Sequence, residues 1–155
     1  MYDARQIANW FISRAIRDGR RFSIMQLLKL IYIAHGWYLE ITGGAPLVRN
    51  KIEAWKHGPV IPDVYRVFRP QGIDINRIDP AFPDQVDAHS ANVLEYVYNN
   101  YGNIPAGKLS DMTHVPGGPW DTASRQFGYF APITNDLILP HYRAIRARFQ
   151  QGQNV

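Results

Sequence analysis

The sequence contains no cysteine among its 155 residues. This absence excludes disulfide frameworks, thiol catalysis and zinc sites built on cysteine. No apolar run approaches the roughly 20 residues that a membrane helix needs. The N-terminal residues also lack the basic and then apolar pattern of a signal peptide. We therefore expect a soluble, cytoplasmic protein with no membrane partner.

Dense runs of one charge are missing as well. The formal net charge is +4, from 17 basic and 13 acidic residues. Such a mild excess permits an acidic partner or a nucleic acid and does not choose between them. The basic residues gather loosely in two groups, Arg17, Arg20 and Arg21 and then Arg143, Arg146 and Arg148. Solvated helix faces are the usual role of such groups, and no helix-turn-helix with a basic recognition helix is evident.

Apolar residues are abundant, at 46% of the chain, and aromatic residues reach 13%. A chain of this length and composition can bury a real core as one domain. We expect that domain to span residues 1–150, with a frayed polar tail over 151–155. The patterning predicts a mainly α, compact helical bundle with a minor short β element.

Residues 24–41 predict the central helix of this bundle. Ser23 and Gln26 form a capping-box pattern at its start, and a Gly-Gly pair follows its end. The segment is apolar over most of its circumference, so we expect neighbours to bury it on several sides. Gly36 inside it costs about 1 kcal/mol relative to alanine, which suggests that another element passes close by.

Start and stop signals predict the remaining elements less sharply. A capping box of Asp3 and Gln6 opens a first helix that stops at Gly19. Further helices are expected over 62–69, 87–101, 105–113, 119–125 and 140–149. Extended pieces are expected at 47–48 and 51–55, as a small hairpin, and at 134–139. A proline-rich loop is expected over 70–85, with a short extended piece at 73–78.

The five histidines show no metal-binding spacing, because none lies four residues from another and no HExxH occurs. They are His35, His57, His89, His114 and His141. We expect no metal and no cofactor. His35 lies among apolar neighbours on the central helix, so a hydrogen-bonded core histidine is its expected role.

Catalysis has little support in the sequence. Ser110, Asp111 and His114 are neighbours on one short helix, and no nucleophile elbow precedes them. Triad members meet through tertiary folding rather than local spacing. An enzyme that uses His57, Asp63 or His114 remains an alternative, and it requires these groups to converge in a pocket. We expect no catalytic residue.

Lys29 and Glu53 are lone charges in otherwise apolar segments. A buried lone charge is costly, so it should be paired or should reach the surface. We expect the two side chains to face each other; the alternative is that both are exposed.

A sharp turn is expected within residues 52–65. Gly58 permits a backbone conformation that other residues avoid, and Pro59 and Pro62 each fix φ and lack a donor. Trp55 and Tyr65 lie on either side of this turn.

Three segments of the chain resemble the motifs of one family, in the same order. Residues 27–39 resemble its LQKLLYFAQGWYL motif, and residues 52–65 resemble its EAWxxGPVxPxVY motif. Residues 109–114, with Pro119 and Trp120, resemble its LSxxTHxxxPW motif. The family is the Panacea domain, which includes SocA-type antitoxins and phage-associated proteins. We assign to the fold the motif residues Lys29, Tyr32, Gly36, Trp37, Glu53, Trp55, Gly58, Pro59, Pro62, Tyr65, Thr113, His114 and Trp120.

This resemblance implies a helical antitoxin without catalytic residues. Such a protein neutralises a cognate toxin, encoded by an adjacent gene, through direct protein contact. Alternatives are a proteolytic adaptor that delivers the toxin to a protease and a regulatory protein that binds nucleic acid. The expected partner-binding residues are Arg5, Arg17, Arg20, Arg21, Lys56 and His57.

Overall fold

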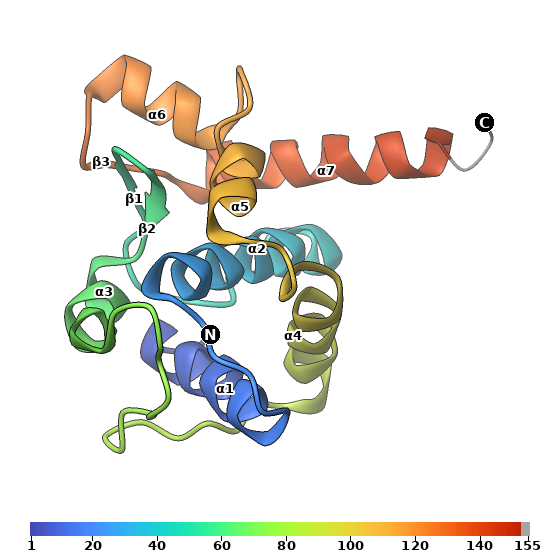
Figure 1. Ribbon diagram of the computed structural model, residues 1–155. Coiled ribbons are helices and arrows are strands. Elements are labelled where there is room, and N and C mark those ends of the chain that lie inside the picture. The colour runs from blue at the N-terminus through green and yellow to red at the C-terminus, as the bar shows by residue number, and fades with distance from the viewer. Residues whose placement is uncertain (153–155) are drawn as a thin grey trace.

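Helix α2, Ile24–Thr42, runs through the centre of the fold (Figure 1). We describe residues 1–152 of a computed structural model. The predicted capping box of Ser23 and Gln26 is present, and the helix ends at Gly43, whose φ is +73°. Side chains on every face of α2 are buried, which confirms the predicted central helix.

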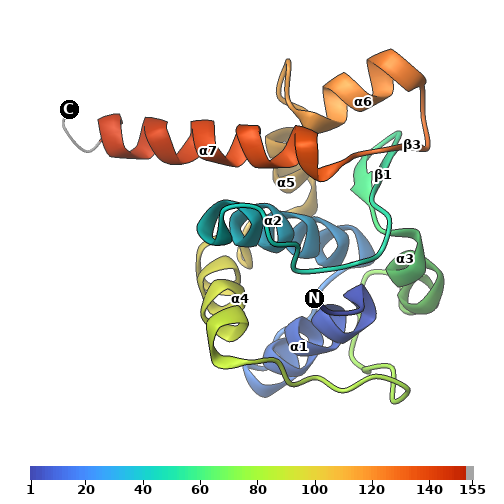
Figure 2. The same ribbon diagram turned by 180° about the vertical axis from the view of Figure 1, so that it is seen from behind.

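The other helices surround α2. Figures 1 and 2 show α2 between α1 on one side and α7 on the other, with α4 beside it. Within residues 1–152 the helices besides α2 are α1 (Ala4–Arg17), α3 (Pro62–Phe68), the short η1 (Arg69–Gln71), α4 (Ala88–Tyr101), α5 (Ala106–Thr113), α6 (Pro119–Phe127) and α7 (Asn135–Gly152). The fold is therefore mainly α, as the sequence predicts.

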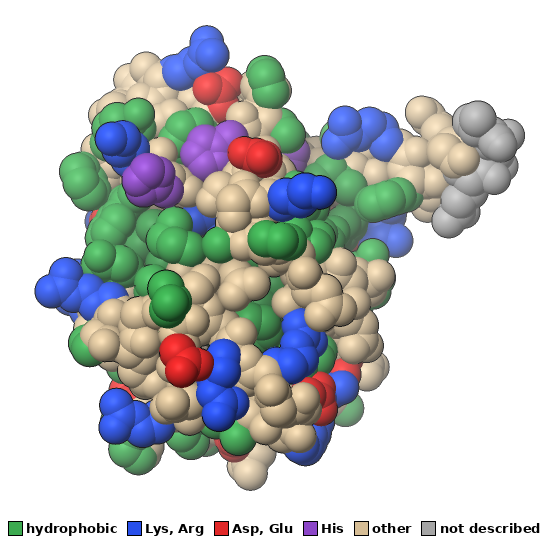
Figure 3. Space-filling view, viewed as in Figure 1, with side chains coloured by type: hydrophobic (Ala, Val, Ile, Leu, Met, Phe, Trp, Pro, Cys, Tyr) green, Lys and Arg blue, Asp and Glu red, His purple; other side chains and the backbone are tan. Residues whose placement is uncertain are grey.

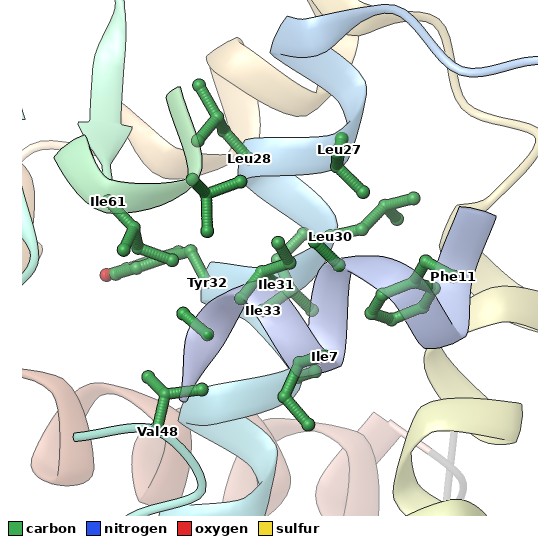
Figure 4. Close-up of a cluster of buried hydrophobic side chains, with 14 of the residues drawn as sticks. Ile7, Phe11, Leu27, Leu28, Leu30, Ile31, Tyr32, Ile33, Val48 and Ile61 are labelled. Atoms are coloured by element: carbon green, nitrogen blue, oxygen red, sulfur yellow. The ribbon is translucent and has the colours of Figure 1, made fainter. Parts of the chain in front are cut away.

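The main core forms where α1 crosses α2 (Figure 4). Ile7 and Phe11 of α1 are fully buried with Leu27, Leu30 and Ile31 of α2. Each large aliphatic or aromatic side chain removed from water contributes about 1.5–3 kcal/mol. This packing holds α2 rigidly and so fixes the elements attached to it.

A small antiparallel sheet lies at one end of α2. Its strand order is β2-β1-β3, with bounds β1 Glu53–Trp55, β2 Gly58–Val60 and β3 Ala131–Pro132. The predicted hairpin between 47–48 and 51–55 is wrong, because β1 pairs with β2 and Val48 instead bridges Tyr2. A strand was not expected at Pro59. It is tolerated because β2 is an edge strand, where a missing donor is harmless.

Helix α7 also departs from expectation. The sequence predicts an extended piece at 134–139 and a helix that begins at Pro140, whereas α7 begins at Asn135 and contains Pro140. Burial of Ile138 and Tyr142 against the body offsets the local cost of the proline. The helix continues to Gly152, beyond the expected end at 149 and into the expected frayed tail. The rest of that tail, 153–155, lies outside the described residues.

The start of α1 differs in one detail. Asp3 caps the helix by accepting from the Arg5 amide, as expected of an N-cap residue. The capping box itself is wrong, because the Gln6 side chain donates instead to the Gln85 carbonyl at 2.6 Å. Tertiary contact thus replaces the local bond.

Two expectations for α2 are confirmed. A Cβ at Gly36 would lie 2.1 Å from the Tyr142 ring, so α7 does pass close by. His35 is buried, with Nε2 2.8 Å from Asn135 Oδ1 and Nδ1 accepting from the Val48 amide at 3.3 Å.

Among residues 1–152, no helix combines the length and apolarity needed to cross a membrane.

Candidate functional site

The three motif segments meet around the β1–β2 hairpin. Helices α5 and α6 lie beside the hairpin (Figure 1). The Trp120 indole donates to the Trp55 carbonyl at 2.7 Å, and the Ser110 hydroxyl donates to the His57 carbonyl at 3.3 Å. Both sides of the turn are therefore fastened to the later motif. We call Lys29, Trp55, Gly58, His114 and Trp120 the hairpin cluster.

Gly58 is the tightest point of the hairpin cluster. Its φ is +122°, a conformation that side chains rarely adopt. A Cβ there would lie 2.6 Å from Lys29 Cε and 3.2 Å from His114 Cε1. Glycine is favoured here, because it adopts this backbone conformation readily and because a side chain would have to displace the end of the buried Lys29.

Lys29 is fully buried beneath this glycine, at 0% exposure. Its Nζ has no hydrogen-bond partner within residues 1–152. Burial without a counter-charge lowers the pKa of Lys29 to about 8. The predicted contact with Glu53 is wrong, because Glu53 Oε1 accepts from the Trp55 indole at 2.9 Å. The alternative is also wrong, since Lys29 does not reach the surface.

Aromatic rings complete the cluster. The His114 and Trp120 rings lie 3.9 Å apart between centroids, and Trp55 makes edge contacts with Tyr65 at 5.0 Å and Phe130 at 5.5 Å. These contacts add packing specificity beyond the buried area. The motif rings thus brace the hairpin against α3 and α6.

The remaining motif residues also support this packing. Thr113 is buried, and its hydroxyl donates to the Ser110 carbonyl at 2.8 Å. Tyr32 is buried in the core, and burial raises the pKa of its phenol. Pro59 lies buried in β2, and Pro62 opens α3 at a position where its missing donor is harmless.

The histidines do not form a catalytic arrangement in the described chain. His114 Nδ1 donates to the Ser110 carbonyl, so it is not aligned with the Ser110 hydroxyl. Asp63 accepts from Asn50 and Arg66. No hydrogen bond within residues 1–152 joins the side chains of His57, Asp63 and His114. No group of three or more potential metal ligands occurs in this part of the chain either.

The expected partner-binding residues lie in three separate places. Arg5 and Arg17 are at opposite ends of α1, about 18 Å apart along the helix. Lys56 and His57 are exposed at the tip of the hairpin, on the other side of α2 from α1 (Figure 1). The six residues therefore do not form one surface, and their role in binding remains a prediction.

Several of these arginines have partners within the fold. Arg5 forms an ion pair with Asp3 at 2.8 Å and lies over the Phe82 ring. Arg20 donates to the Gly102 carbonyl at 2.6 Å and lies over Tyr98. Arg21 is 3.5 Å from Asp74. Arg17, at the end of α1, is exposed.

Sequence reasoning missed an exposed aromatic turn beside the hairpin. Phe127, Tyr129 and Phe130 are exposed where α6 leads into β3. Phe130 has a φ of +70°, unusual for a bulky residue. Its amide donates to the Ala54 carbonyl at 2.7 Å, which helps to hold the turn. The FGYF run was the available signal.

Comparison with known proteins identifies the family. Residues 27–121 match the model of the Antitoxin SocA-like, Panacea domain. The chain belongs to this family. It is 38% identical over 132 residues to Antitoxin SocA of Caulobacter vibrioides (strain NA1000 / CB15N), covering 77% of this chain and 69% of that protein. No solved structure matches the chain.

The residues that match the Panacea domain form the centre of the fold. They begin in the first turn of α2 and end in the first turn of α6, so they contain the whole hairpin cluster. Helices α1 and α7 lie outside the match. The match to the family model therefore covers the centre of the fold.

Proposed function

We propose that this chain neutralises a toxin encoded by an adjacent gene through direct protein–protein binding. Membership of the Panacea domain family supports an antitoxin role, and such a role implies a toxin partner. The family name does not specify how a toxin is silenced. Direct binding is the mechanism that needs nothing from this chain beyond a stable surface.

The inward direction of the motif side chains carries this proposal. Lys29 of α2 packs beneath Gly58, and the Trp120 indole of α6 donates to the hairpin backbone, so both helices brace the hairpin. They therefore build a stiff scaffold, and a stiff scaffold loses little conformational entropy when its surface binds a partner. Recognition then depends on the exterior.

Co-expression with the adjacent gene tests the proposal. We expect the neighbouring product to arrest growth alone, the full chain to restore growth, and the two proteins to co-purify at a fixed ratio. Toxicity that the chain does not relieve, or relief without a complex, would contradict direct neutralisation.

The level of the toxin separates blocking from degradation. Blocking leaves the half-life of the toxin unchanged or longer in the presence of the chain. A half-life shortened by the chain, and restored by deleting a cellular protease, would instead show delivery to that protease. Measuring the half-life by pulse-chase in the rescued cells therefore decides between the two modes.

A further inference from the structure

An open groove of about 530 Å³ lies between the end of α2, α4 and α7. Its lining includes Trp37 and Ile41 of α2, His89 and Tyr96 of α4, and Arg146 and Phe149 of α7. We call it the α2–α4–α7 groove. Its volume falls within the roughly 300–1,000 Å³ of sites that bury apolar groups of a ligand.

The floor of the groove is held in place by aromatic contacts. Trp37 lies edge-on to Tyr142 at 5.0 Å and to Tyr96 at 6.3 Å between ring centroids. Its indole donates to the Tyr101 hydroxyl at 3.2 Å. Rigid aromatic side chains in a hollow are the usual anchors of protein interfaces.

One wall is equally fixed. Arg146 of α7 lies over the Trp37 ring at 5.7 Å and forms an ion pair with Glu40 at 2.5 Å. These contacts join α7 to α2 at the point where α7 leaves the body. The groove is therefore formed before any partner arrives, which lowers the entropy cost of binding.

Apolar side chains are exposed to solvent in the α2–α4–α7 groove. Ile41 is 45% exposed, Tyr96 is 46% exposed and Phe149 is 56% exposed. Single exposed apolar residues are ordinary, whereas these three line the same groove. Helix α7 projects beyond the body as an arm, and Figure 3 shows hydrophobic side chains gathered beneath it.

The second half of α7 carries charge of one sign, although Glu40 of α2 pairs with Arg146. From Leu137 to Gly152, α7 carries three arginines and no acidic residue. Helical spacing places Arg143 on the same side of α7 as Arg146, whereas Arg148 is about 200° around the helix from Arg146. Because Glu40 already pairs with Arg146, a complementary partner would present acidic groups toward Arg143.

We propose that the α2–α4–α7 groove binds an amphipathic helix of the toxin, and this proposal rests on the proposed function. The apolar face of that helix covers Ile41, Tyr96 and Phe149, and acidic residues on its flank face Arg143 of α7. Grooves between helices take amphipathic helices in this way. Helix α7 lies outside the residues 27–121 that match the family model, so this wall of the groove is separate from the hairpin cluster.

Apolar substitutions in the groove provide the first test. Ile41→Glu and Phe149→Glu place a charge where the apolar face of the helix would lie. Ile73→Glu is the matched control, because Ile73 is 86% exposed and lies outside the groove. With the adjacent-gene product as probe, we expect each groove variant to raise Kd at least 30-fold, about 2 kcal/mol or more. The control should change Kd less than 3-fold.

Charge reversal on α7 tests which side of this helix the acidic residues of the toxin face. Arg143→Glu should lower the association rate at low salt several-fold, and the loss should shrink at high salt. Arg148→Glu makes the same charge change on the opposite side of α7 and should leave the rate within 2-fold. Equal effects of the two variants would overturn the inference that the toxin helix presents acidic residues to this side of α7.

Hydrogen exchange of the complex locates the contact independently of mutation. We expect protection in α4 and in the second half of α7, and a single protected helical segment in the toxin. Protection confined to the hairpin and the aromatic turn at 127–130 would overturn the inference.

The outcomes separate this inference from the proposed function. If the unaltered chain binds the toxin and the groove variants bind equally well, only the groove inference falls. If the unaltered chain forms no complex, the proposed function fails and the groove inference fails with it. If Ile41→Glu abolishes self-association of the chain and leaves toxin binding intact, the occupant is a second copy and the inference is overturned.

Discussion

The hairpin cluster and the α2–α4–α7 groove are both built on α2, yet they differ in almost every physical respect. The cluster is closed, with Lys29 fully buried and Gly58 too crowded for a side chain. The groove is open, with Ile41 and Phe149 about half exposed. One region uses its aromatic rings to brace a turn, and the other leaves them available.

This difference shows where stability and recognition lie in the molecule. The hairpin cluster takes two residues from each of the later two family motifs and one residue from the first. The groove draws on Trp37 of the first motif and otherwise on residues outside the motifs. Substitutions in the cluster should therefore change stability, and substitutions in the groove should change binding.

The largest effect is expected from Gly58→Ala. The new Cβ would lie 2.6 Å from Lys29 Cε at a positive φ. Backbone strain of about 1–3 kcal/mol and overpacking of a similar size should destabilise the fold by about 2–5 kcal/mol. Urea unfolding checks this. Gly19→Ala is the control, because φ is +70° there with nothing within 4 Å, and it should cost about 1–2 kcal/mol. Equal losses of stability in the two variants would show that contact with Lys29 does not add to the cost at Gly58.

Removal of the buried charge should stabilise the fold. Lys29→Met keeps the apolar stem and removes an amine whose pKa falls from 10.5 to about 8. That shift corresponds to about 3 kcal/mol at pH 7. Because the folded pKa is below the unfolded one, the unfolded state binds more protons between pH 8 and 10.5, and wild-type stability rises across that window.

The pH dependence gives this prediction its control. The advantage of Lys29→Met in urea unfolding should be full at pH 7 and smaller at pH 9.5. A variant that is less stable than wild type at pH 7 would show that the Lys29 amine has a favourable partner. In that case the hairpin cluster would bind a group that pairs with the Lys29 amine, and it would not be a closed core.

A smaller loss is expected from Trp120→Phe. The change removes the indole bond to the Trp55 carbonyl, which is 2.7 Å long, and keeps an aromatic ring beside His114. One lost hydrogen bond to a half-buried carbonyl should cost about 1–2 kcal/mol. Phe127→Leu on the exposed side of α6 is the matched control and should stay within about 0.5 kcal/mol. Thermal unfolding of the two variants distinguishes them.

The smallest effect on stability is expected in the groove. Ile41 is half exposed at the end of α2, so Ile41→Glu should change the free energy of unfolding by no more than about 0.5 kcal/mol. A loss above 2 kcal/mol in urea unfolding would mean that the groove is part of the core. The contrast between the two regions would then disappear.

The sequence predicted the centre of the molecule well, because its signals there are local. The cap of Ser23 and Gln26, the periodicity of α2 and the internal Gly36 all follow from neighbours along the chain. The later family motif was expected to serve the fold, and the structure gives its residues contacts across the hairpin.

The failures occur where tertiary contacts override local signals. Pro140 suggested a helix start, but burial of Ile138 and Tyr142 extends α7 backwards to Asn135. Charge alone suggested that Lys29 would meet Glu53, whereas the indole of Trp55 takes that carboxylate. The groove could not be predicted, because it forms between three helices whose relative positions no local pattern encodes.

Paired measurements on two variants test the account most directly. Free energy of unfolding and toxin Kd should be determined for Trp120→Phe and Ile41→Glu in the full chain. We predict that Trp120→Phe loses about 1–2 kcal/mol of stability and keeps its Kd within about 3-fold. We predict that Ile41→Glu keeps its stability and weakens Kd at least 30-fold. The reverse pattern, with binding lost at Trp120 and retained at Ile41, would place toxin recognition at the hairpin and contradict the account.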